Sequence, residues 1–98
     1  MAISFTRSII ARLEKEIADL QALALEQTKK RDQAAAKIKQ LQRDQKLSQS
    51  INDLNGKLAR ETKLKKSIDE INGLLAKSSK QLTEKKAQLA QHRQQAAE

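Results

Sequence analysis

Several residue types that build rounded protein cores are missing or scarce in this chain of 98 residues. It contains no cysteine, proline, tryptophan or tyrosine, one phenylalanine and two glycines. Without cysteine there are no disulfides and no thiolate metal sites. A chain with few helix breakers that is rich in Ala, Leu, Lys, Gln, Glu and Arg is typical of long helices or coiled coils. We therefore expect an all-α protein.

Long apolar runs are also missing from the sequence. None approaches the roughly 18 residues that a membrane-spanning helix needs. The first residues, MAISFTRSIIARLEKEI, are interrupted by Arg7 and Arg12 and do not have the pattern of a signal peptide. These features predict a cytoplasmic protein that has no transmembrane segment.

Apolar residues in the first half of the chain recur at alternating intervals of three and four, which is the repeat of a helix that packs against a partner helix. In the second half this repeat is interrupted twice, after Leu41 and after Leu58. The first interruption coincides with DQKLSQS, where Ser48 and Ser50 are candidate N-caps, so we expect a turn there. The second interruption amounts to a loss of three residues, a stammer.

The expected fold is an antiparallel two-helix coiled-coil hairpin, with helices over about residues 5–45 and 51–95 and a turn over about 46–50. Folding near residues 47 and 48 would place Leu41 opposite Leu54, and Leu13 opposite Leu82, although heptad phase fixes such pairings only modulo seven. A continuous helix is the alternative. The residues expected in the seam between the helices are Ile10, Leu13, Ile17, Leu20, Ile38, Leu41, Leu54, Leu58, Ile68, Ile71, Leu75 and Leu82.

Two similar stretches, SINDLNGKLAR and SIDEINGLLAK, begin at Ser50 and Ser67. Each contains an Asn-Gly pair, which is a common turn signal. The expected seam passes through both stretches, so their similarity mainly reflects helix packing. Gly56 and Gly73 are then expected inside the second helix, facing outward, at a cost of about 1 kcal/mol each relative to alanine.

No arrangement of catalytic residues is recognisable in the sequence. The single histidine, His92, has no cysteine near it and is expected to be a solvated or seam-edge residue. Acid pairs such as Glu14 and Glu16 lie on a surface without a pocket that would shift their pKa values. A two-helix hairpin also has no enclosed cavity for a substrate. We expect no enzyme activity, no cofactor and no metal site.

The net charge of +8 is concentrated in the middle of the chain. Residues 29–66 contain twelve bases and four acids, whereas the remaining residues contain eight of each. In a hairpin the middle of the chain lies nearest the turn, where it could contact nucleic acid phosphates, an anionic membrane surface or an acidic partner. A solvated surface is the alternative. The residues assigned to this basic tip are Lys37, Lys39, Arg43, Lys57, Lys63, Lys65 and Lys66.

Some apolar residues lie off the seam. Because an isolated two-helix hairpin buries little surface, a second apolar stripe predicts a homodimer that packs into a four-helix bundle. Leu23 is expected beside Leu74 in this stripe. Scattered surface leucines are the alternative. The residues assigned to the oligomer face are Ile9, Leu23, Leu25, Gly73 and Leu74.

Three stretches carry a resemblance to a known family: FTRSIIARLEKEIADLQ, KIKQLQRDQKLSQSINDLNGKLARE and LTEKKAQLAQHRQQ. They resemble the N-terminal coiled-coil region of bacterial proteins that carry a Toll/interleukin-receptor-like domain. Phe5, Thr6 and Arg7 match the start of such regions, and Ser48 and Ser50 match their Ser-rich turn. The resemblance implies an assembly module, with any NAD-cleaving or signalling chemistry in another domain.

These features lead to three hypotheses about function. The first is a non-enzymatic coiled-coil oligomerisation or scaffold module that assembles or positions an effector domain or partner protein. The second is a basic hairpin that binds nucleic acid phosphates without sequence specificity, since aromatic residues for base stacking are scarce. The third is a small adaptor or secretion chaperone whose exposed stripe receives the helix of another protein.

Overall fold

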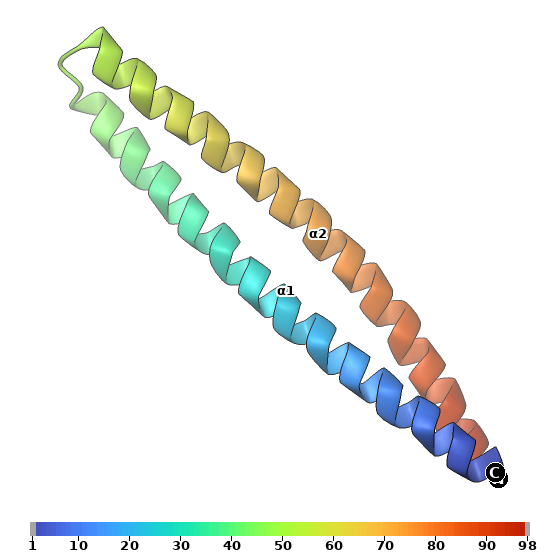
Figure 1. Ribbon diagram of the computed structural model, residues 1–98. Helices are drawn as coiled ribbons and strands as arrows, with labels where there is room; N and C mark the ends of the chain where they lie inside the picture. Colours follow the sequence, from blue (N-terminus) through green and yellow to red (C-terminus); the bar gives the residue numbers. More distant parts are fainter. Residues whose placement is uncertain (1, 98) are drawn as a thin grey trace. The chain divides into compact units, whose positions relative to one another are not determined.

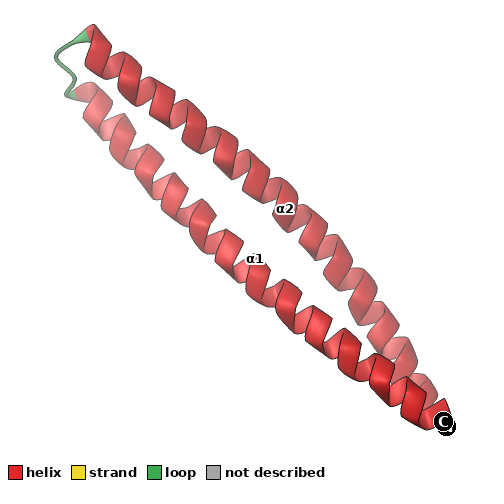
Figure 2. Cartoon of the chain, in the orientation of Figure 1, coloured by secondary structure: helices red, strands yellow, loops and turns green. Residues whose placement is uncertain are grey.

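A computed structural model describes residues 2–97, and the side chains of residues 5–97, as two long helices and one turn (Figure 1). Helix α1 spans Ala2–Lys46 and helix α2 spans Ile51–Ala97. The described residues contain no strand, as Figure 2 shows. The expected all-α fold, an antiparallel hairpin of two helices, is confirmed.

Residue composition explains the length of the helices. Both consist mainly of strong helix formers, and no proline interrupts them. Gly56 and Gly73 lie inside α2 with ordinary helical backbone angles, and a Cβ added at either would meet no heavy atom within 4 Å. Both Asn-Gly pairs are therefore helical, as predicted, and both glycines border open space.

Residues 47–50 form the turn between the helices. The hydroxyl of Ser50 accepts a hydrogen bond from the backbone N–H of Asp53 at 3.1 Å, which is the N-cap of α2 predicted from the sequence. Leu47 and Ile51, at the two ends of the turn, are each 77% exposed. These two residues therefore do not extend the seam between the helices.

The chain forms two compact units. Of the described residues, 2–25 and 76–97 make up what we call the terminal unit, and 26–75 make up the turn unit. In each unit a segment of α1 and a segment of α2 run side by side in opposite directions (Figure 1).

The core of the terminal unit is a cluster of Leu13, Ile17 and Leu89. Leu82, which was expected opposite Leu13, is partly buried and packs against this cluster. Leu89 lies one heptad further along α2 and is the more buried of the two. The isoleucines that also pack against the cluster are Ile9 and Ile10.

The seam of α2 in the turn unit differs from the sequence-based expectation. Its covered positions are Leu54, Lys57, Glu61 and Leu64, which continue the intervals of three and four without a break. Leu58, which was assigned to the seam, is exposed. The stammer predicted after this residue is therefore absent, because two charged residues occupy seam positions that are normally apolar.

The pairing of the helices in the turn unit lies one heptad further along α2 than expected. Leu41 was expected opposite Leu54, yet its neighbour Gln42 forms a hydrogen bond with Glu61 at 2.9 Å. Both pairings keep the same heptad phase, so apolar spacing does not choose between them. The polar contacts between the helices distinguish the observed pairing.

Candidate functional site

Lys57 connects the turn to both helices. Its ammonium donates hydrogen bonds to the carbonyl oxygen of Asp44 and the hydroxyl of Ser48, each at 3.0 Å, and lies 2.9 Å from Oδ2 of Asp53. Hydrogen bonds from Lys57 and then Ser48 lower the pKa of the Asp53 carboxyl. Three acceptors match the three donors of an ammonium, and the Lys57 side chain is only 17% exposed. Lys57 was assigned to the basic tip, but its charge is used within the hairpin.

Glu61 is a buried carboxylate in the seam, with 7% of the residue exposed. It accepts hydrogen bonds from the amides of Gln45 at 2.7 Å and Gln42 at 2.9 Å, and Lys65 lies 3.1 Å from Oε1. These hydrogen bonds, that of Gln45 first, lower the pKa of Glu61 from 4.5 to about 2. The ionised carboxylate thus joins α1 to α2, and Lys65 of the basic tip is part of this contact.

The other residues assigned to the basic tip face solvent. None of them forms an ion pair with another described residue, so their charges are available to an anionic partner. These residues are Lys37, Lys39, Arg43, Lys63 and Lys66.

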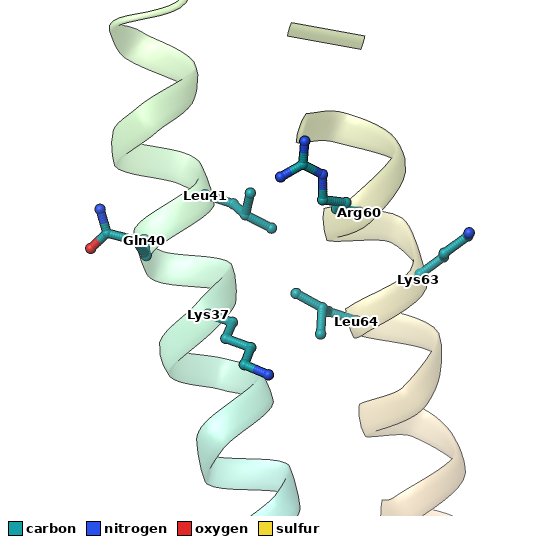
Figure 3. Close-up of a pocket in the computed structure, with 6 residues that line it drawn as sticks. All are labelled: Lys37, Gln40, Leu41, Arg60, Lys63 and Leu64. Carbon is teal, nitrogen blue, oxygen red and sulfur yellow. The ribbon is translucent and has the colours of Figure 1, made fainter. Parts of the chain in front are cut away.

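A groove of about 450 Å³ lies between α1 and α2 in the turn unit. Leu41 and Leu64 point toward each other from the two helices and form its floor (Figure 3). Lys37 and Arg60 extend beside them from opposite helices, whereas the ammonium of Lys63 is directed away from the other helix (Figure 3). The groove therefore combines an apolar floor with positive charge from both helices. Arg60 was not singled out from the sequence.

A second hollow of about 420 Å³ continues this groove and shares Lys37 and Leu64 with it. It is lined by residues 27–37 of α1 and 64–74 of α2. Within it, Leu74 of the predicted oligomer face lies with Gln27 and Lys30. Lys30 is 3.7 Å from Glu26, so its charge is partly compensated.

The predicted seam residues differ in burial. Leu13, Ile17 and Ile38 are buried, and Leu58 is exposed. The half-buried seam residues are Ile10, Leu20, Leu41, Leu54, Ile68, Ile71, Leu75 and Leu82. Most side chains in the seam between the two helices therefore remain partly exposed to solvent.

The residues of the predicted oligomer face do not share one environment. Ile9 is half-buried against the chain's own core. Leu23 and Leu25, in the terminal unit, are 46% and 60% exposed, and Leu74, in the turn unit, is 52% exposed. Gly73 is exposed as well. The placement of Leu23 beside Leu74 stays a prediction.

Ion pairs join the two helices in the terminal unit. Lys85 lies 2.6 Å from Glu16, and Arg93 lies 3.1 Å from Glu14. The hydrogen bond from Lys85 lowers the pKa of the Glu16 carboxyl. His92, half-buried three residues after Leu89, occupies the seam-edge position expected for it. The acids singled out in the sequence thus serve helix pairing.

The described residues contain no group of three or more His, Cys, Asp or Glu side chains that could hold a metal ion. Within residues 2–97, neither helix has an apolar stretch of the length needed to cross a bilayer. Comparisons with protein-family models, curated proteins and solved structures found no match.

Proposed function

We propose that this chain is a non-enzymatic helical module that self-associates and thereby assembles or positions an effector domain or partner protein. The observation that carries this proposal is the apolar surface that the hairpin leaves uncovered. Leu23, Leu25 and Leu74 each have roughly half of their surface exposed to water, although leucine is among the residues most often buried. A second copy of the chain is the simplest partner that would cover them.

The exposed surface of the chain is large enough for such an interface. It amounts to 7545 Å², whereas a compact monomer of this mass, 11.0 kDa, is expected to expose about 5,600 Å². The difference, about 1,900 Å² for one chain, exceeds the roughly 800 Å² that each partner buries in a standard protein–protein interface. Apolar surface that a second copy covers contributes about 25 cal/mol per Å² to the free energy of association.

Light scattering coupled to size-exclusion chromatography tests the proposal. We expect a mass of at least two chains of 11.0 kDa. The double variant Leu23→Gln/Leu25→Gln should associate more weakly and keep its helical circular dichroism, because neither leucine belongs to the core of the hairpin. Leu47→Gln, at an exposed leucine in the turn, is the matched control. A monomer mass for the unaltered chain over the whole accessible concentration range would contradict the proposal.

A second candidate function is binding to nucleic acid phosphates, favoured by the exposed cations of the turn unit that lack an ion pair with another described residue. Such binding would be indifferent to base sequence and would weaken steeply with salt. Fluorescence anisotropy with labelled duplex DNA at about 50 mM salt tests it. Lys39→Glu/Lys63→Glu/Lys66→Glu should weaken binding and leave association intact, because these three lysines are exposed and form no ion pair with another described residue. Absence of any complex would eliminate this function.

A further inference from the structure

The groove of the turn unit lacks a partner for its charges. Lys37 and Arg60 extend from opposite helices beside Leu41 and Leu64, and neither cation forms an ion pair with another described residue. Both leucines are only half-buried. A ligand that fits this surface needs a carboxylate next to an apolar side chain.

The extent of the groove indicates a helical ligand. The two connected hollows follow residues 27–41 of α1 and 60–74 of α2. Each segment is about 21 Å long at about 1.5 Å per residue. The lining residues recur about every three or four positions on both helices, so they lie on one face of each helix and extend along its axis. A helix of about four turns has the length and shape to lie along such a stripe.

The chain itself contains a helical segment with the complementary chemistry. Residues 13–26 of α1, LEKEIADLQALALE, are as long as the groove and contain four acids, of which Glu14, Glu16 and Glu26 already form ion pairs within the chain. Asp19 is exposed and forms no ion pair with another described residue. Leu23, four residues later, lies on the same side of the helix and is about half exposed. Together they offer a free carboxylate one turn from an exposed leucine.

We propose that the groove of the turn unit in one copy binds the α1 segment 13–26 of a second copy, with Asp19 beside Lys37 and Arg60, and Leu23 on the floor formed by Leu41 and Leu64. This inference rests on the proposed self-association and identifies its two surfaces. Lys37 and Arg60 are exposed in the single hairpin, so their attraction to Asp19 should weaken as the salt concentration rises. Opposite charges also determine the alignment of the two helices.

Charge reversal tests the contact. In sedimentation equilibrium at about 50 mM salt, Lys37→Glu/Arg60→Glu should weaken self-association by about tenfold or more, and Asp19→Lys should weaken it as well. Arg43→Glu/Lys66→Glu is the matched control, because it reverses one Arg and one Lys, one on each helix, outside the groove. The control should associate more strongly than the groove variant.

The decisive sample is an equimolar mixture of the groove variant and Asp19→Lys. In the mixture each groove meets a segment of opposite charge, so association should return in mixed complexes. Circular dichroism establishes that every variant is folded. The inference is overturned if the control weakens association as much as the groove variant does, or if the mixture does not associate. A monomeric unaltered chain would overturn the proposed function too, whereas unaltered association of the groove variant would overturn this inference alone.

Discussion

Replacing Lys57 by methionine should destabilise the hairpin at its turn. Methionine keeps an unbranched apolar side chain of similar length and a high helix propensity, so packing and helix formation change little. What disappears is the ammonium that contacts Asp44, Ser48 and Asp53. The substitution therefore measures the polar connection between the helices at the turn.

The structure sets the size of this effect. Each of the two partly buried hydrogen bonds, to the Asp44 carbonyl and the Ser48 hydroxyl, contributes about 1 kcal/mol or slightly more. The pair with Asp53, whose side chain is about half exposed, adds little because solvent screens it. The Asp44 carbonyl keeps a hydrogen bond from the backbone N–H of Leu47 at 3.0 Å, so no buried acceptor is left unpaired. We expect Lys57→Met to lower the free energy of unfolding by about 2–3 kcal/mol.

Urea unfolding followed by circular dichroism, at one fixed protein concentration, measures this difference. A loss of 2–3 kcal/mol should lower the urea midpoint by about 1–2 M for a chain of this size. Lys66→Met is the control, because Lys66 is an exposed lysine of the same helix without an ion pair to another described residue. If the free energies of unfolding of the two variants differ by less than about 0.5 kcal/mol, the Lys57 ammonium does not stabilise the turn.

Three further predictions use the same unfolding measurement. Gly56→Ala and Gly73→Ala should each raise the free energy of unfolding by up to about 1 kcal/mol, since both sites have room for a Cβ; a decrease would contradict that. Ser50→Ala should lower it by about 1 kcal/mol through loss of the N-cap, while Ser50→Asp should retain it. The pKa of Glu61 is lowered from 4.5 to about 2, so its contribution is fully present above pH 4.5 and is lost as the pH falls toward 2. Glu61→Gln should flatten the stability curve in that window, and an unchanged curve would refute the role of this carboxylate.

Much of the fold was predictable from spacing and composition. The unbroken intervals of three and four from Ile10 to Leu41 predicted α1, and Ser50 marked the start of α2. The second helix was harder because Lys57 and Glu61 interrupt its apolar pattern. Charged residues are rarely covered, so the spacing of apolar residues alone skips these two seam positions and predicts a break where the helix has none.

The candidate site was less predictable than the fold. Counting charges located the basic turn unit, but it did not separate Lys57, which has three acceptors, from Lys37, which has none among the described residues. It also missed Arg60, whose position beside Leu41 and Leu64 depends on how the helices are aligned. That alignment is fixed by contacts between residues far apart in sequence, and heptad phase does not encode it.

The charged seam residues Lys57 and Glu61 also disfavour a wrong alignment of α1 with α2. If α2 slid by one heptad, to the pairing that its apolar residues would equally allow, Glu61 would move from its two glutamines to Ala35 and Ile38, which have no donor to offer it. Lys57 would move from Asp44 toward Lys37, a like charge. A slipped hairpin would keep the pair between Glu61 and Lys65, which lie on the same helix, but Glu61 would lose both of its hydrogen bonds from α1. Since both charges lie within the first turns of α2, a hairpin that closes from the turn outward meets this penalty before Leu64 and the seam residues beyond it can pair.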